Sequence, residues 1–142
     1  MILNKYKNKT GFTLIELMVV IFIVGVLSAV AIPLMRGRID SSKWSEGKSM
    51  AGTIRSAIRV LYADLGTNYD YSTITTLTQL GFKVTDFDGK YFRNQDFTFS
   101  ITNKIGDPLE YKITVTAKNS PDAPHTPGGM TLDQKGDFEE IP

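Results

Sequence analysis

An uncharged apolar stretch of 19 residues, Leu17–Met35, constrains the fold of this chain more than any other feature. As an α-helix it would be roughly 28 Å long at ~1.5 Å per residue, close to the hydrocarbon thickness of a bilayer. Twelve of its residues are Leu, Ile, Val or Phe. Together these side chains favour membrane insertion by roughly 4 to 7 kcal/mol. The stretch therefore predicts a helix that spans a membrane.

The segment before this stretch is basic. Residues 1–11 contain three lysines and no acidic side chain, and Glu16 is the only ionisable residue between Phe12 and Met35. A secretory signal peptide is the alternative, because it also has a basic start, and Ser28–Ala31 resembles its cleavage site. The apolar core of a signal peptide is only about 7–15 residues long. The greater length here favours a span that is retained.

A short motif overlaps the start of the apolar stretch. After the basic leader the chain reads Gly11-Phe12, then Glu16 four residues beyond that Phe, with Pro33 near the end of the apolar run. This arrangement closely resembles the processing signature of type IV prepilins and of the pseudopilins of type II secretion. The resemblance implies that a membrane peptidase cuts between Gly11 and Phe12 from the cytoplasmic side. It also implies that the same enzyme methylates the new amino terminus of Phe12.

Glu16 has two interpretations, and the residues alone leave both open. Thr13-Leu14-Ile15-Glu16 fits a capping box, in which the Glu side chain bonds a free backbone N–H at the helix start. A carboxylate beside a membrane span is energetically expensive and by default functional. The resemblance implies that Glu16 neutralises the terminal amine of a neighbouring subunit when helices stack in a filament. We therefore expect Glu16 to set the register of assembly.

Gly25 and Pro33 interrupt the otherwise strong helix. Proline removes one backbone donor and clashes with the preceding turn, so a kink or local loosening is expected near Pro33. Membrane helices also tolerate both residue types without functional consequence. The resemblance implies that this weak point melts during assembly.

After Arg36 the apolar residues become one-sided, which is typical of an amphipathic helix. The stripe consists of Trp44, Ala51, Ile54, Ile58, Leu61 and Leu65. We expect the helix to end at Leu65, with Gly66 as a left-handed cap. A continuous helix from Phe12 would be 54 residues and roughly 80 Å long. A chain of 142 residues cannot bury that length, so one half must lie in lipid or among sister helices.

The remainder of the chain predicts a small antiparallel sheet. Residues 97–102 and 111–118 alternate between apolar and polar side chains, as half-buried strands do. We expect further strands at Phe87–Arg93 and Gly129–Gln134, a short helix at Thr73–Leu80 closed by Gly81, and an irregular exposed loop at Ser120–Gly128. A long helix laid across this sheet gives an α+β fold. The pilin family has the same layout.

Catalytic and ligand sites are poorly supported. The chain has no cysteine and one histidine, His125, without an acid, base or nucleophile set beside it, so we predict no enzyme, no cofactor and no metal centre. Its net charge of +1 predicts no nucleic-acid partner. Gly47-Lys48-Ser49 lacks the preceding Gly of a phosphate-binding loop. Four acidic residues lie near the end: Asp133, Asp137, Glu139 and Glu140. We expect them to form a solvated tail. The alternative is a calcium site like the calcium-stabilised loop of major pseudopilins, but their spacing does not match a known calcium-binding loop.

Four segments follow from these observations: 1–11, a cleaved leader; 12–35, a transmembrane and filament-core helix; 36–66, its amphipathic continuation; and 67–142, a globular domain. The resemblance implies a structural subunit of a type IV pilus-like filament. Its partners would be copies of itself, minor subunits, the prepilin peptidase, an inner-membrane assembly platform and the lipid bilayer. The precursor would lie in the bacterial inner membrane with its globular domain exported, before joining a periplasmic pseudopilus or an extracellular pilus. A pseudopilin of type II secretion and a membrane-anchored binding domain that never polymerises remain alternatives.

Overall fold

A computed structural model describes residues 11–103 and 105–141. The chain divides into two compact units, Met1–Arg36 and Gly37–Pro142. Helix α1, Leu14–Leu65, contributes its first part to the N-terminal unit and its second part to the globular unit. Most of the leader, residues 1–10, lies outside the described residues.

The N-terminal unit is a helix whose apolar side chains are exposed. Ile21 and Phe22, for example, keep 68% and 72% of their surface accessible, and Val20 keeps 49%. Within the described part of the chain, α1 is the one helix long and apolar enough to cross a membrane. Water does not tolerate such a continuous apolar surface, so this surface needs lipid or other helices around it.

The second part of α1 packs through the stripe expected from its periodicity. Trp44, Ala51, Ile54 and Ile58 are buried, and Leu61 is half-buried against the same core. Leu65 is 42% exposed, so including it in the buried stripe was wrong, because the helix has reached its end there. Gly66 follows with a positive φ of 72°, and its N–H donates to the carbonyl of Tyr62. The predicted helix end is confirmed.

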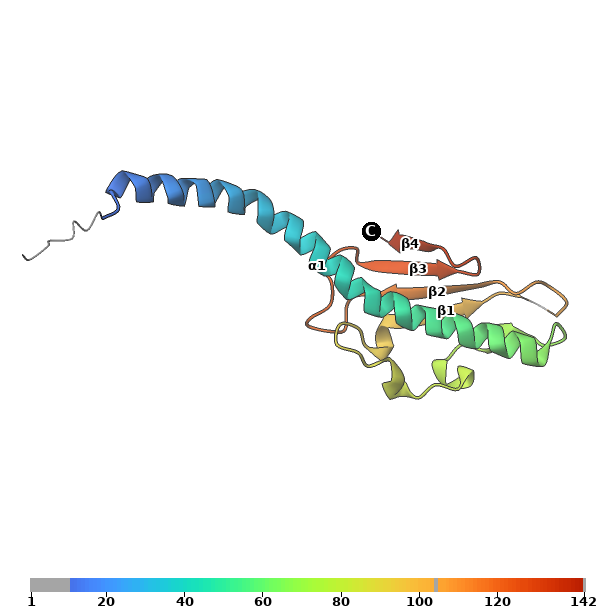
Figure 1. The fold of residues 1–142 in the computed structure, drawn as a ribbon. Helices are drawn as coiled ribbons and strands as arrows, with labels where there is room; N and C mark the ends of the chain where they lie inside the picture. Colours follow the sequence, from blue (N-terminus) through green and yellow to red (C-terminus); the bar gives the residue numbers. More distant parts are fainter. Residues whose placement is uncertain (1–10, 104, 142) are drawn as a thin grey trace, which may run out of the picture. The chain divides into compact units, whose positions relative to one another are not determined.

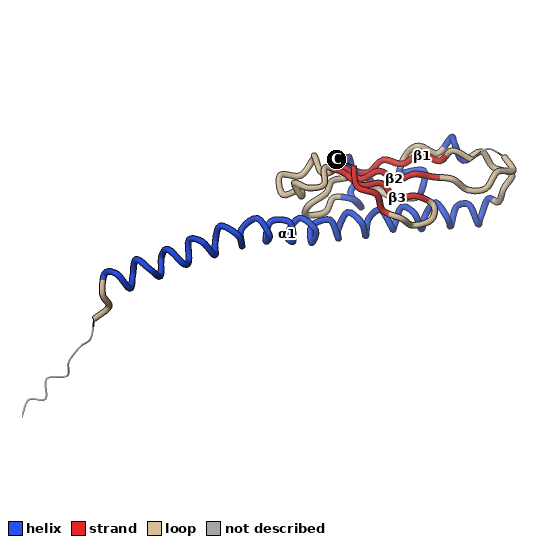
Figure 2. Tube along the Cα trace, turned by 90° about the horizontal axis from the view of Figure 1, so that it is seen from above, coloured by secondary structure: helices blue, strands red, loops and turns tan. Residues whose placement is uncertain are grey.

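The globular unit has a four-stranded antiparallel sheet in the order β1-β2-β3-β4. Its strands are β1 (Phe97–Ile101), β2 (Tyr111–Thr116), β3 (Gly129–Asp133) and β4 (Phe138–Ile141). The second part of α1 lies along one face of this sheet (Figures 1 and 2). Side chains from β2 alternate between the core and the surface, with Ile113 and Val115 fully buried. The predicted α+β fold is confirmed.

Two predicted elements are not found, and one strand was not predicted. Phe87–Arg93 is not a strand: it begins at the end of a 3₁₀ turn, Val84–Phe87, and continues as a loop. In that loop the backbone N–H groups of Tyr91 and Phe92 donate to the Glu46 carboxylate on α1, so no strand partner satisfies them.

Thr73–Leu80 is not a continuous helix, because two 3₁₀ turns, Tyr71–Thr73 and Leu77–Leu80, replace it. Gly81 does close the second turn, with a φ of 90°. Strand β4 includes Glu139 and Glu140 of the acidic segment near the end, which was predicted to be a solvated tail or a calcium-binding loop and not a strand.

The loop Ser120–Gly128 is irregular, as expected, but part of it is buried. Ser120, Ala123 and Pro124 are buried. Asp40 on α1 holds the loop: its Oδ2 atom accepts hydrogen bonds from the backbone N–H groups of His125 and Thr126, each at 3.2 Å. The expectation of a fully exposed loop was therefore wrong, because a distant carboxylate draws the loop onto the helix.

Candidate functional site

The predicted cleavage residues precede the helix. Gly11, Phe12 and Thr13 have no regular secondary structure, and α1 begins at Leu14. The Phe12 side chain is 77% exposed, and an added Cβ on Gly11 would meet no atom within 4 Å. The peptide bond between Gly11 and Phe12 therefore lies in an exposed, non-helical segment, the kind of segment in which proteolytic cleavage is commonest.

Glu16 caps the first turn of α1. Its Oε2 atom accepts hydrogen bonds from the backbone N–H and the hydroxyl of Thr13, at 2.8 and 2.9 Å. In return the Thr13 hydroxyl accepts a bond from the Glu16 backbone N–H at 3.3 Å. These bonds form the capping box that the sequence allows. Among the hydrogen bonds of the described residues, all of those to the Glu16 carboxylate use Oε2, so Oε1 is available to another cation or donor.

Gly25 and Pro33 lie inside a continuous helix. The loosening expected around Pro33 stays a prediction. Gly25 lies in an open apolar hollow on the helix surface, where an added Cβ would meet no atom within 4 Å. The hollow is lined by Met18, Ile21, Phe22, Gly25, Val26 and Ala29. Side chains of a second helix can fill such a hollow and approach the backbone closely.

The first part of α1 therefore combines two properties. It exposes large apolar side chains on every side, and Glu16 is its only charged side chain before Arg36. Apolar packing gives helices affinity for each other but little information about their relative height. A single charge among apolar side chains can supply that information, because a misplaced charge loses its partner.

The acidic residues near the end are arranged around the turn between β3 and β4. The Asp133 Oδ1 atom accepts from the backbone N–H groups of Gly136 and Asp137, at 2.9 and 3.0 Å, and these bonds lower the pKa of Asp133. Glu139 and Glu140 are exposed on β4. Within residues 11–103 and 105–141 no group of three or more His, Asp or Glu side chains is placed to hold a metal ion.

Two features of the globular unit were not found from the sequence. One is the set of carboxylates that hold loops, described above for Asp40 and Glu46. The other is a pocket beside β1, lined largely by threonine and amide side chains. The four threonines within residues 73–78 could have indicated a polar surface in the sequence. Only the fold shows that β1 lies opposite them and forms the other side of a pocket.

The comparisons with known proteins agree with the motif. Residues 6–32 match the family described as "Prokaryotic N-terminal methylation motif". The chain is 35% identical over 112 residues to a type IV major fimbrial protein FimA of Dichelobacter nodosus, covering 78% of this chain and 66% of that protein. A second FimA of the same organism is 46% identical over 103 residues, 72% of this chain and 62% of its own length.

A third relative, the fimbrial protein EcpC of Eikenella corrodens, is 45% identical over 56 residues, 39% of this chain and 37% of that protein. The chain thus spans between 37% and 66% of the length of these three relatives. No solved structure matches the chain. The methylation motif, the fimbrial relatives and the helix-on-sheet architecture lead to one conclusion. The chain belongs to the type IV pilin family.

Proposed function

We propose that this type IV pilin is cut between Gly11 and Phe12, methylated at Phe12 and assembled through its N-terminal helix into an extracellular pilus. The observation that supports the proposal most strongly is the exposed apolar surface of the first part of α1, residues 14–35, with Glu16 as the one carboxylate of that part. Before assembly this surface lies in lipid. After assembly the same side chains pack against those of neighbouring helices.

In this proposal Glu16 bonds the terminal amine of a neighbouring subunit. Cleavage converts the Phe12 nitrogen into an α-amine with a reference pKa of ~7.7, whereas a Glu carboxyl has a reference pKa of ~4.3, so both are charged at neutral pH. Removing one partner of such a buried pair costs about 3–5 kcal/mol. The Thr13 bonds use only Oε2, which leaves Oε1 for the amine.

The proposal also assigns partners and a location. The precursor lies in the bacterial inner membrane with its globular unit exported, and it contacts the prepilin peptidase, an assembly platform, minor subunits and copies of itself. The leader and the far end of the span are both basic, so charge alone orients the helix poorly. The fimbrial names of the relatives support a pilus rather than a type II secretion pseudopilus.

Two variants separate assembly from capping. Glu16→Ala removes the carboxylate, whereas Thr13→Val removes the hydroxyl of the cap and keeps the carboxylate. We expect Glu16→Ala to insert and to be processed normally but to be strongly depleted from sheared filaments. We expect Thr13→Val to be incorporated close to the wild-type level. Equal losses in both variants would show that capping is the important role of Glu16.

A third variant tests processing. Gly11→Val should leave the leader attached, because the residue before the cut gains a branched side chain. Intact-mass measurement of the purified chain should show a methylated Phe12 terminus for the wild type and a terminus within the leader for Gly11→Val. A wild-type chain that keeps its leader would instead support a membrane-anchored domain that does not polymerise.

A further inference from the structure

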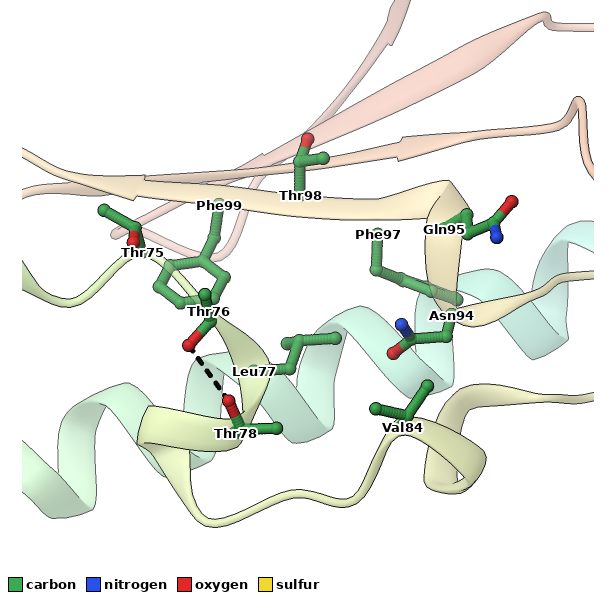
Figure 3. Close-up of a pocket in the computed structure, with 10 residues that line it drawn as sticks. All are labelled: Thr75, Thr76, Leu77, Thr78, Val84, Asn94, Gln95, Phe97, Thr98 and Phe99. Atoms are coloured by element: carbon green, nitrogen blue, oxygen red, sulfur yellow. Dashed lines mark hydrogen bonds between the residues drawn. The ribbon is translucent and has the colours of Figure 1, made fainter.

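A pocket of about 420 Å³ lies between β1 and the Thr75–Thr78 segment (Figure 3). It is remote in sequence from the N-terminal motif and belongs entirely to the globular unit. Its volume is in the range of small-ligand sites. The residues that line it are Thr75, Thr76, Leu77, Thr78, Val84, Asn94, Gln95, Phe97, Thr98 and Phe99.

The chemistry of this lining is uncharged, with hydroxyl and amide groups beside phenyl rings. Figure 3 shows the Asn94 amide directed toward the Thr75–Thr78 segment, whereas Thr98 and Gln95 point away from it. The Asn94 Oδ1 atom is buried, and no group of residues 11–103 and 105–141 donates a hydrogen bond to it. A buried acceptor without a donor is unfavourable, so a ligand that brings an O–H or N–H group to Asn94 gains more than it would at an exposed site. Neighbouring atoms cover Oδ1 in the unliganded structure, so the Asn94 side chain turns toward the pocket when this bond forms.

The threonine wall of the pocket is held in place. The Gln79 Oε1 atom accepts from the backbone N–H groups of Thr75 and Thr76, at 2.9 and 3.0 Å, and from the Thr76 hydroxyl at 2.9 Å. The Thr76 and Thr78 hydroxyls lie 3.0 Å apart. The hydroxyl groups are therefore positioned before any ligand arrives, which lowers the entropy lost on binding.

The pocket also meets an edge of the sheet that no other strand of the described residues covers, because β1 is the first strand in the order β1-β2-β3-β4. The backbone N–H of Thr102 donates to the backbone carbonyl of Glu110, which follows the β1–β2 pairing. Because backbone groups of alternate residues point to opposite sides of a strand, those of Thr98 and Ser100 point toward β2. Those of Phe97 and Phe99 point toward the free edge. The lining ends at Phe99. It thus spans only three residues of β1, about 7 Å, which is too short for an added strand but sufficient for one compact ring.

We propose that this pocket binds an uncharged, hydroxyl-bearing ring, a hexopyranose unit of a carbohydrate. Sugar hydroxyls both donate and accept, so they complement the Asn94 amide oxygen and the threonine hydroxyls together. The phenyl ring of Phe99 lies beside Thr75 and Thr76 in Figure 3 and offers an apolar surface to the C–H groups of the sugar. This inference goes beyond the proposed assembly role and does not depend on it.

The test uses the full chain in a zwitterionic detergent without a sugar headgroup, so that the detergent cannot occupy the site. The probes are the methyl glycosides of glucose, galactose, mannose, N-acetylglucosamine and N-acetylgalactosamine. The readout is the NMR shift of the Asn94 side-chain amide and of the Thr76 and Phe99 backbone amides. We expect at least one glycoside to bind with a millimolar dissociation constant and to shift these signals together.

Matched variants identify the contacts. Asn94→Ala and Phe99→Leu should each weaken the binding of that glycoside about tenfold. Their controls lie outside the pocket: Asn68→Ala in an exposed turn, and Phe138→Leu on β4. Both controls should bind as the wild type does, and the amide spectrum of each variant shows whether it has folded.

Two results would overturn the proposal. One is that all five glycosides, raised to about 100 mM, leave the Asn94, Thr76 and Phe99 signals of the folded wild type unmoved. The other is that an uncharged hexapeptide binds instead and shifts the β1 amides through Ile101, which would assign the site to an added strand. If the wild-type chain binds no glycoside but assembles normally into filaments, this inference alone is refuted and the proposed function stands.

Discussion

The carboxylate of Asp40 accepts hydrogen bonds from both the backbone N–H and the hydroxyl of Thr126, 86 residues further along the chain. The two distances to Oδ2 are 3.2 and 3.3 Å, and Asp40 is buried. The contact joins the start of the globular part of α1 to the loop that precedes β3. It is therefore a long-range restraint on a segment without regular secondary structure.

Asp40→Ala should release this loop. Hydrogen bonds to a buried charged group contribute about 1.5–3 kcal/mol each, and the loop N–H groups can partly return to water, so we expect a loss of about 2 kcal/mol in the free energy of unfolding. Denaturant titration measures the loss, and hydrogen exchange should accelerate at Thr126. The control is Asp122→Ala, an exposed acid in the same loop, which should change stability by less than about 0.5 kcal/mol.

Two glycines on α1 should respond in opposite directions to alanine. A Cβ added to Gly47 would lie 2.9 Å from Cζ of Phe92, whose fully buried ring cannot move freely. Gly47→Ala should therefore destabilise the globular unit by about 1–2 kcal/mol, despite the better helix propensity of Ala. At Gly52 the added Cβ meets nothing within 4 Å, so Gly52→Ala should stabilise it by about 0.5–1 kcal/mol.

Thermal unfolding of the two variants measures this difference. If Gly47→Ala stabilised the chain as much as Gly52→Ala, the conclusion that α1 packs closely against Phe92 at Gly47 would be contradicted. The loss in the double variant Gly47→Ala with Phe92→Leu should be smaller than the sum of the two single losses, because the smaller side chain makes room for the methyl group.

The turn between β3 and β4 should be sensitive to acid. Backbone N–H groups of Asp137 and Gly136 bond the ionised Asp133 side chain and lower its pKa in the folded state. The stabilisation is therefore complete above the unfolded pKa of ~3.9 and is lost as the pH falls through the lower folded pKa. Asp133→Asn should reduce the acid dependence of unfolding below pH ~4. An unchanged acid dependence would contradict the role of these hydrogen bonds.

Enlarging Gly25 should impair assembly in proportion to the added volume. Gly25→Leu occupies more of the apolar hollow than Gly25→Ala does, and both variants keep the helix apolar enough to insert. If the filament packs through this hollow, sheared filaments should contain less Gly25→Ala than wild type and least of Gly25→Leu. Membrane fractions should contain equal amounts of the wild type, Gly25→Ala and Gly25→Leu. If Gly25→Leu were incorporated as well as the wild type, the hollow would not be part of the contacts between helices.

The parts of the fold that sequence analysis predicted correctly depend on local patterns. The helical stripe through Trp44 and Ile58, the cap at Gly66 and the alternation in β1 and β2 each follow from spacings of a few residues. The N-terminal motif is also local. Its capping geometry at Thr13 and Glu16 was one of two interpretations that the residues allowed, and the structure contains it.

The errors arose where distant partners override local preference. Phe87–Arg93 has the composition of a strand, but Glu46 on α1 bonds its backbone across 45 residues. Strand β4 was missed because Phe138–Ile141 carries two acids, and only its pairing with β3 makes it part of the sheet. No short-range pattern contains either partner.

The amino-acid sequence by itself determined the apolar span, the prepilin-like motif that includes Gly11 and Phe12, and the single charge at Glu16. These properties belong to one continuous segment, so no fold is needed to bring them together. The tertiary structure alone decided that Asp40 holds Thr126 and that Asn94 faces the Thr75–Thr78 segment. The physical reason is that a buried carboxylate or amide is satisfied by whatever group the fold places beside it, and that group can be far away in the chain.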